Sequence, residues 1–358
     1  MINTSQSKAR FASALLAGAA CLSLGACAEE AEEIIETVTV VGSSTVYPFA
    51  QKVAEDAVAA NEGLAAPDIS STGSSEGIAE FCKGQGPDTV DIVNASRRMT
   101  LDEFNACQSA GVSDIIEIKV GRDGIVFAAA IEKGFDFGLT PATVYRALSA
   151  SPFGEEQTSA NWSDVAGGLP DEPIIVYGPS ETSGTRDALL DVIMMPVCTA
   201  NAAMVALEES DPEAFETNCH ALRNDSAYVD QGEKDELVVS KIANNPSAIG
   251  IFGYSYLEEN ADRIRGLTLG GVAPNAETIA DGSYPGSRPL YLYVKKAHIG
   301  VTPGIEEYLA QWAKSWSADG PLTQIGLVPA TGEVQEKSAA AIANSTALTQ
   351  ADFEEAAE

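Results

Sequence analysis

The sequence predicts an α/β fold with mostly parallel sheets, because β-type runs and helical patterns alternate along the chain. The 358 residues, of which 45% are hydrophobic, favour two globular domains over one. Fifty-two acidic and 21 basic residues give a formal net charge of −31. This charge argues against nucleic acid as a partner, because contacts to a phosphate backbone need clustered Lys and Arg.

The first part of the chain alternates short strands with helices. "TVTVVG" (37–42) predicts a strand, and the alanine-rich pattern after it predicts a helix over 46–61. "APDISSTGSSEG" leads into a helix near 78–83, and "DTVDIVNAS" predicts another strand. "TLDEFNACQSAG" predicts a helix with Thr100 as its N-cap and Glu103 at the third helical position. "IIEIKV" and "GIVFAAAI" predict two further strands.

The remainder repeats the alternation. "LTPATVYRALSA" predicts a helix started by Thr140 and Pro141, and "EPIIVYGPSETSGTRDALLDVIMM" predicts a strand, a loop and a helix. "DELVVSKIANNPSAIGIFGYSYLEEN" predicts helix, turn, strand and helix. "SRPLYLYVKK" predicts a strand, "GIEEYLAQWAKSW" predicts a helix, and the Ala- and Glu-rich end predicts a helix or a tail.

The first residues predict a targeting signal. Lys8 and Arg10 form a positive region, and "FASALLAGAACLSL" (11–24) is an apolar stretch too short for a membrane span. The following "LGAC" resembles the lipobox of bacterial lipoproteins, in which the cysteine is acylated. We expect residues 1–27 to be a lipoprotein signal peptide with lipidation at Cys27. An ordinary cleaved signal that ends nearby is the alternative.

Cysteine usage supports export to an oxidising compartment. Two of the six cysteines belong to the targeting region, and the other four form an even set. We predict local disulfides, Cys82 with Cys107 and Cys198 with Cys219, each closing a loop of about 20 to 25 residues. Zinc is disfavoured, since the chain has no CxxC spacing and only two His. We therefore expect no metal and no cofactor.

Three places share one design, in which a strand is followed by a corner of Gly, Ser and Thr and then by a helix. They are the first corner, "GSSTVYP" (Gly42–Pro48), the second, "STGSSEG" (Ser71–Gly77), and the third, "SETSGTRDALL" (Ser180–Leu190). A single hydroxyl at such a corner is usually a helix N-cap. Several hydroxyls at each of three corners exceed that need. Converging helix N-termini with small, neutral donors predict an oxyanion site.

The three corners, in this order and spacing, resemble the phosphate-binding proteins that deliver phosphate to ABC importers. "DIVNASRRM" (Asp91–Met99), "GRDGIVFAA" and "GPSETSGTRDALLD" extend the resemblance. It runs from about Thr37 to the "PLYLYVKK" strand, about three quarters of the chain. "SGTRDA" preceded by "YGPSET" is specific to this family, whereas "GSST" alone is not.

The resemblance implies the two-lobed periplasmic-binding-protein fold of type II, in which two lobes joined by a hinge close over one anion. Residues 28–36 would be an acidic linker. Residues 37–134 and 255–358 would form lobe I, and 135–254 lobe II, each with a mostly parallel sheet flanked by helices. The protein would be a monomer in the periplasm that binds phosphate without catalysis and delivers it to an ABC permease. Its only membrane contact would be the lipid anchor.

The resemblance also carries site residues over, position by position. The phosphate-binding candidates are Ser44, Thr45 and the Val46 backbone at the first corner, Ser74 and Ser75 at the second, and Ser183, Gly184 and Thr185 at the third.

Two positions depart from the family pattern. Many relatives carry an Asp after the "AS" of "NAS", where it accepts the proton of phosphate, and this chain has Arg97. Others carry an Arg four residues before Ser-Gly-Thr, where this chain has Pro179 and instead places Arg186 after the motif. Arg97 and Arg186 are candidate phosphate ligands, since a guanidinium can donate two hydrogen bonds to tetrahedral oxygens. The alternative is surface ion pairs, for Arg186 with Asp187 or Glu181.

A carboxylate near the anion would distinguish protonated phosphate from fully ionised sulfate. We name Glu76 as a possible proton acceptor, with Asp91 and Asp123 as further candidates. The simpler interpretation is that Glu76 only complements the positive end of its helix.

Three other functions stay open. The protein could be a sensor or scavenger that delivers its ligand to no transporter. The site could bind another oxyanion, such as sulfate or molybdate. The chain could also be a serine hydrolase, because "GSSEG" (73–77) fits the GxSxG pattern with Ser75 as nucleophile. Such an enzyme would need His220 or His298 as its base.

Overall fold

The structure is a computed structural model that describes residues 37–132, 134–181, 183–232 and 235–354. The predicted signal peptide, the lipidation at Cys27 and the linker 28–36 lie outside the described residues.

In the described chain, nine strands form one sheet in the order β2-β1-β3-β9-β4-β7-β5-β6, with β8 paired to β4. The strands are β1 (Thr39–Gly42), β2 (Asp68–Ser71), β3 (Ile92–Ala95), β4 (Ile115–Ala130), β5 (Val176–Gly178), β6 (Tyr228–Asp230), β7 (Ile249–Gly253), β8 (Ile264–Gly266) and β9 (Ser287–Lys295). The strands β1, β2 and β3 are parallel, as are β5, β6 and β7. The predicted α/β fold is therefore confirmed.

Helices separate and follow these strands. They are α1 (Tyr47–Ala60), α2 (Ser74–Phe81), α3 (Leu101–Ser109), α4 (Pro141–Leu148), α5 (Trp162–Val165), α6 (Gly184–Ala188), α7 (Met195–Thr199), α8 (Ala202–Ser210), α9 (Pro212–His220), α10 (Asp235–Asn244), α11 (Tyr254–Glu259), α12 (Ala276–Ala280), α13 (Ile305–Ser315), α14 (Gly332–Asn344) and α15 (Ala351–Glu354). Short 3₁₀ turns are η1 (Pro152–Gly154), η3 (Lys296–His298) and η4 (Thr323–Ile325), and η2 (Leu189–Met194) is a π-helix.

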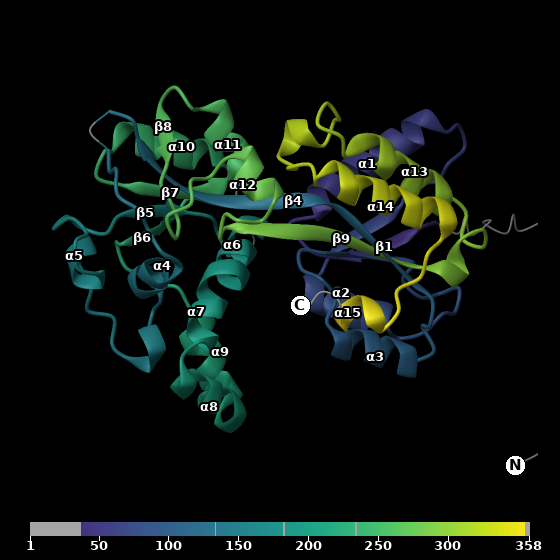
Figure 1. Cartoon of the computed structure of the whole chain (residues 1–358), viewed down its shortest axis with the longest axis horizontal. Coiled ribbons are helices and arrows are strands. Elements are labelled where there is room, and N and C mark those ends of the chain that lie inside the picture. Colours follow the sequence, from purple (N-terminus) through teal and green to yellow (C-terminus); the bar gives the residue numbers. More distant parts are fainter. Residues whose placement is uncertain (1–36, 133, 182, 233–234, 355–358) are drawn as a thin grey trace, which may run out of the picture. The chain divides into compact units, whose positions relative to one another are not determined.

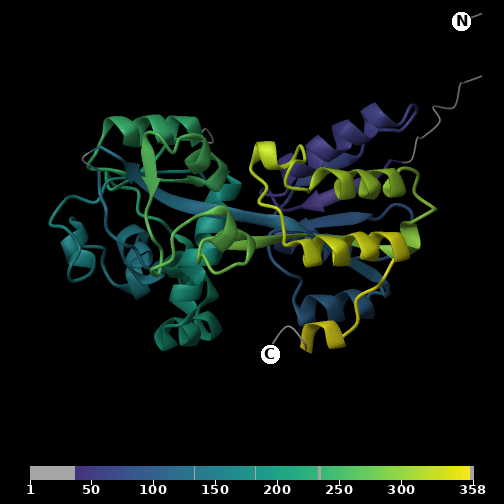
Figure 2. The same cartoon turned by 45° about the horizontal axis from the view of Figure 1, so that its top comes forward.

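The long strands β4 and β9 run antiparallel beside each other (Figures 1 and 2). The sequence predicted two strands in the β4 region, which was wrong, because β4 is one strand of 16 residues. The glycines of "VGRDG" do not turn the chain. Pairing with β9 continues from Gly121↔Leu290 to Gly124↔Ser287, and an irregularity after Lys119 absorbs the change of register.

Alternation along the strands sends side chains to two separate cores. Val40 and Leu292 pack with α1 and α13, whereas Val41 and Tyr293 pack with α2 and α3 on the opposite face. Figures 1 and 2 show these helix pairs on opposite sides of the strands. The corners at the ends of β1 and β2 are therefore held between two packed helix layers.

A third core gathers around the second half of β4. It contains Ile125–Ala129 of this strand together with β5 and β7. It also contains Leu257, Ile264 and Leu269, which the sequence-based boundaries assigned to lobe I. Both halves of β4 are therefore buried, but in different cores.

The predicted disulfides Cys82–Cys107 and Cys198–Cys219 are confirmed. So is the capping box of α3, in which Thr100 accepts from the Glu103 N–H and Glu103 accepts from the Thr100 N–H. The helix predicted near 78–83 begins earlier, because Gly73, at φ 85°, allows α2 to begin at Ser74.

In the described ranges, no single helix is long and apolar enough to cross a membrane. One bent pair of helices, Gly184–Thr199 with Ala202–Ser210 at 101°, reaches that length and composition only when taken together.

Gly42 ends β1 in a conformation that other residues rarely adopt. Its φ is 126°, and a Cβ there would lie 2.1 Å from the Asn94 carbonyl oxygen. We predict that Gly42→Ala lowers the free energy of unfolding by more than about 3 kcal/mol, from strain and clash together. Urea denaturation followed by circular dichroism measures this.

Gly111→Ala is the matched control, since Gly111 has φ 88° but no atom within 4 Å of an added Cβ. Strain alone should cost about 1–2 kcal/mol there. Equal losses for the two variants would show that the contact with Asn94 contributes nothing.

Candidate anion-binding site

The hydroxyls of the first corner do not cap its helix. The N-cap residue of α1 is Val46, and in the described structure no side-chain hydrogen bond caps this helix. The corner is formed by backbone bonds instead, since the Ser43 N–H donates to the Asn94 carbonyl and the Tyr47 N–H to the Ser43 carbonyl, both at 3.0 Å. The side chains of Ser43, Ser44 and Thr45 are therefore available for other contacts.

The second corner likewise has a glycine N-cap, Gly73, and within the described chain no side chain caps α2. The Ser74 hydroxyl accepts from the Ser96 N–H at 3.0 Å, which joins this corner to the segment after β3. The Ser75 hydroxyl accepts from Arg97 Nη2 at 2.8 Å. The hydroxyls of this corner thus organise a polar surface around the helix N-terminus.

The third corner contacts the first directly. Ser183 caps α6 by accepting from the Thr185 N–H at 3.2 Å. The Ser44 hydroxyl donates to Asp187 Oδ2 at 2.5 Å, across 143 residues of sequence. A Cβ on Gly184 would lie 2.8 to 2.9 Å from atoms of Thr45, so only glycine permits this approach.

Arg288, at the start of β9, connects the first and third corners. Its Nη2 donates to the Thr45 hydroxyl and, at 2.7 Å, to the Gly184 carbonyl. Its Nε lies 3.3 Å from Asp123 Oδ2 on β4, and the Arg288 side chain is only 3% exposed. Asp123 therefore holds the guanidinium in place from the partner strand.

The corners surround a cavity of about 370 Å³, which we call the corner cavity. It is lined by Ser43, Ser44, Thr72, Gly73, Ser74, Ser75, Glu76, Ser96, Arg97, Asp187, Leu190, Asp191 and His220. Six of the thirteen lining residues are Ser or Thr, whose hydroxyls are neutral groups that can donate to an anion.

Charged groups of both signs reach the corner cavity. Arg97 pairs with Glu103 at 2.7 Å, and this hydrogen bond raises the pKa of the guanidinium. Desolvation by the surrounding pocket walls raises the pKa of the Asp191 carboxyl, although its residue is exposed, and the nearby Asp187 raises it further. Glu76 is an exposed residue at the cavity edge. The cavity therefore contains carboxylates as well as a guanidinium.

Several buried polar atoms at the corners have no hydrogen-bond partner among the described residues. Two are guanidinium nitrogens, Arg186 Nε and Arg288 Nη1. The others are Thr72 Oγ1 and Asn94 Oδ1. A buried donor without an acceptor is costly, and most such groups in proteins are paired.

The predicted site residues fall into two groups. Ser44, Ser74, Ser75, Arg97 and Glu76 line the corner cavity. The other predicted residues contact the first corner, the N-terminus of α6 or the core: Thr45, Val46, Ser183, Gly184, Thr185 and Arg186.

Arg186 is buried rather than on the surface. Its guanidinium lies 5.1 Å from the centre of the Tyr228 ring, and within the described residues it forms no ion pair with Asp187 or Glu181. Burial raises the pKa of Tyr228 to about 12, so its hydroxyl is neutral and donates to the Pro179 carbonyl at 2.7 Å.

Two carboxylates named as proton acceptors are engaged elsewhere. Asp91 is buried and bonds to His298 Nδ1 at 2.6 Å and to the Thr302 hydroxyl at 2.9 Å. Asp123 pairs with Arg288. Neither lines the corner cavity.

Sequence reasoning missed Arg288, which joins two of the corners, and Asp191, which lines the corner cavity, and it named His220 only as a possible base of a hydrolase. Arg288 had a visible signal, because it is a cation just before the mostly apolar run "PLYLYV". Asp191 lies one helical turn after Asp187, a spacing that puts both on one helix face. His220 carries no such signal, since α9 brings it to the cavity from a distant part of the chain.

The chain is similar to two known proteins over most of its length. The protein SphX of Synechocystis is 26% identical over 315 residues, which cover 87% of this chain and 83% of that protein. The phosphate-binding protein PstS of Staphylococcus saprophyticus is 25% identical over 273 residues, 75% of this chain and 73% of that protein.

A solved structure agrees with these relatives. The crystal structure of a possible phosphate binding protein from Planctomyces limnophilus matches with a TM-score of 0.67 at 26% identity, covering 86% of this chain and 98% of that one. The predicted fold class is thus confirmed. The model of the PBP superfamily domain matches residues 28–317, more than half of the chain, and the chain belongs to this superfamily.

Proposed function

We propose that this protein binds inorganic phosphate at the three corners and delivers it to an ABC phosphate importer. The similarity to PstS, a phosphate-binding protein, and to a possible phosphate binding protein of known structure supports this ligand. SphX is similar over an even larger share of the chain.

The observation that carries the proposal is the pair of unpartnered guanidinium nitrogens at the corners. Arg186 Nε follows the Ser-Gly-Thr turn, and Arg288 Nη1 belongs to the side chain that joins Thr45 to Gly184. Both are buried donors that need acceptor oxygens. A tetrahedral oxyanion offers such oxygens, and charge-assisted hydrogen bonds of this kind are among the strongest in proteins.

Carboxylates favour phosphate over sulfate and molybdate. Glu76, Asp187 and Asp191 line the corner cavity and would repel a fully ionised anion. Phosphate carries a proton that a carboxylate accepts, so repulsion becomes a hydrogen bond. Glu76 remains our candidate acceptor, because Asp187 already accepts from Ser44.

We propose binding without chemical conversion. Ser75 accepts a hydrogen bond from Arg97, and among the described residues its hydroxyl does not donate to a histidine, as a catalytic serine would. His298, one of the two possible bases, is buried against Asp91 and the Gln85 carbonyl. The hydrolase alternative would therefore rest on His220, whose Nδ1 bonds to Glu216.

The division into lobes follows from the separate cores. We propose that the second half of β4, residues 135–254 and residues 255–284 move together, since they share one core. The first half of β4 packs in the other cores with β1, β3 and β9. In this proposal the protein acts as a periplasmic monomer, anchored by a lipid at Cys27, and presents phosphate to a permease.

The ligand can be identified by a thermal-shift panel of phosphate, arsenate, sulfate and molybdate. A ligand that binds only the folded state raises the melting temperature by mass action. We predict that phosphate and arsenate raise it and that sulfate and molybdate do not. A shift with sulfate alone, or with no oxyanion, would overturn the proposed ligand.

Replacing Arg288 tests the donor that sequence reasoning missed. We predict that Arg288→Lys weakens phosphate binding by about tenfold or more, because an ammonium cannot reproduce the forked contacts to Thr45, Gly184 and the anion. Isothermal titration calorimetry measures the change. Arg265→Lys is the matched control, since Arg265 bonds to the carbonyls of Gly134 and Phe135 away from the corners. Equal affinities for both variants would contradict a role for Arg288.

Glu76→Gln tests the proposed proton acceptor. Without the carboxylate charge, phosphate affinity should change its pH dependence between about pH 5 and pH 9, and sulfate should bind better relative to phosphate. Glu80→Gln, on the same helix but outside the corner cavity, should leave both properties unchanged. Unaltered pH profile and selectivity in Glu76→Gln would assign the proton to another acceptor.

A further inference from the structure

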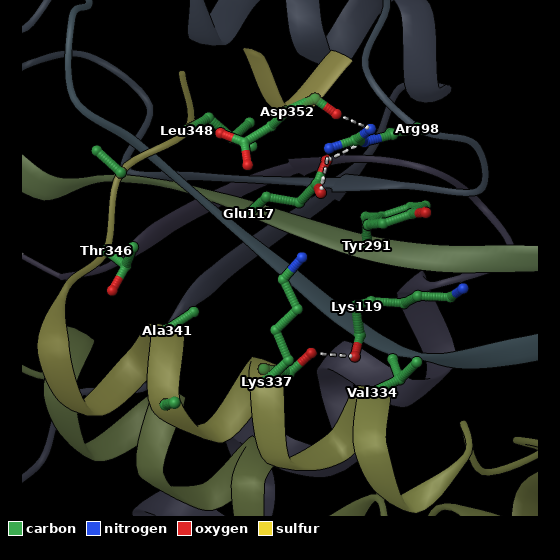
Figure 3. Close-up of a pocket in the computed structure, with 13 residues that line it drawn as sticks. Arg98, Glu117, Lys119, Tyr291, Val334, Lys337, Ala341, Thr346, Leu348 and Asp352 are labelled. Carbon is green, nitrogen blue, oxygen red and sulfur yellow. Dashed lines mark hydrogen bonds and ion pairs between the residues drawn. The ribbon is translucent and has the colours of Figure 1, made fainter. Parts of the chain in front are cut away.

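A second cavity, of about 560 Å³, lies beside the C-terminal segment and shares no residue with the corner cavity (Figure 3). We call it the C-terminal cavity. One wall is the face of β4 and β9, and the other is formed by α14 and the chain that leads from it to α15. It is lined by Arg98, Glu117, Lys119, Tyr291, Val334, Lys337, Ser338, Ala340, Ala341, Thr346, Ala347, Leu348 and Asp352.

The two carboxylates of this cavity are already compensated. Glu117 accepts from Arg98 Nε at 2.8 Å and from Arg98 Nη2 at 2.9 Å. Asp352 accepts from both the N–H and the hydroxyl of Thr349 at 2.7 Å, and this bonding lowers the pKa of the carboxyl. Neither acid needs a further cation.

The two lysines of the cavity have no directly bonded partner in the described structure, and the opposite charges that act on Lys119 and Lys337 are those of the nearby Glu117 and Asp352 respectively. Among the described residues, neither Lys119 nor Lys337 forms an ion pair or a side-chain hydrogen bond through its ammonium group. Lys119 is half-buried on β4, and burial lowers the pKa of its ammonium, with Arg122 adding repulsion. Figure 3 shows Lys337 extending from α14 into the space in front of the strands. Unpaired cations are unexpected in a chain with 52 acidic and 21 basic residues.

The rest of the wall combines a neutral donor with an apolar surface. Tyr291 lies opposite Lys119 in the backbone register of β4 and β9. Burial raises the pKa of its phenol to about 12. The hydroxyl is therefore protonated at neutral pH and able to donate. Val334, Ala341 and Leu348 supply aliphatic contacts on the opposite side.

We propose that the C-terminal cavity binds a small organic carboxylate, paired with Lys119 and Lys337 and packed against the aliphatic wall. Small-molecule sites commonly span about 300–1,000 Å³ and combine apolar walls with a few convergent polar groups. An inorganic oxyanion would leave most of this volume and the whole aliphatic wall unused. The site is independent of phosphate binding at the corners.

The test uses hexanoate and its neutral analogue hexanamide, added to the full chain in saturating phosphate. Hexanoate should raise the melting temperature, and hexanamide should not, because only the carboxylate pairs with the lysines. In isothermal titrations, Lys119→Gln combined with Lys337→Gln should weaken hexanoate binding by about tenfold or more. Phosphate affinity should be unchanged in that double variant.

Lys314→Gln, an exposed lysine on α13 outside the cavity, is the matched control and should bind hexanoate normally. If the double variant unfolds, the single variants are compared with Lys314→Gln in the same titration. Equal shifts with hexanoate and hexanamide, no shift with hexanoate, or equal hexanoate affinity in the lysine variants and the control would each overturn the proposal.

Discussion

The guanidinium of Arg288 is the interaction on which the candidate site depends. It is held by Asp123 on β4, bonds to Thr45 at the first corner and to the Gly184 carbonyl at the third. Strands β4 and β9 are antiparallel neighbours, and Asp123 pairs in register with Arg288. The sheet therefore fixes a cation that connects two corners separated by more than a hundred residues in sequence.

The acidic character of the chain is compatible with an anion site because most donors at the corners are neutral. Two of the three helices have no side-chain cap in the described structure, so their hydroxyls are free to form the wall of the corner cavity. Backbone dipoles and hydroxyls bind an anion without net charge. In our proposal the carboxylates of the same cavity select for anions that carry a proton.

The fold could be predicted well from the sequence, because it rests on local patterns. Alternating runs located β1, β3, α1 and α3, and the spacing of four cysteines predicted both disulfides. The continuity of β4 was missed, and two strands were predicted in its place, because "VGRDG" has the composition of a turn. Only its pairing with β9, which is far away in sequence, keeps it extended.

The candidate site could be predicted in part. The hydroxyl-rich corners are visible as local motifs, whereas Arg288 and His220 reach the site through strand pairing and helix packing. Arg186 shows the same limit, because it is followed by the acidic Asp187 in sequence and yet its contact is with Tyr228. Residues whose partners are distant in sequence are the ones that local reasoning assigns wrongly.

A crystal structure of the protein with phosphate tests the central claim most directly. The account predicts phosphate oxygens within hydrogen-bonding distance of Arg186 Nε and Arg288 Nη1, which have no partner in the described structure. Phosphate bound away from the corners, with both nitrogens still lacking an acceptor, would contradict it.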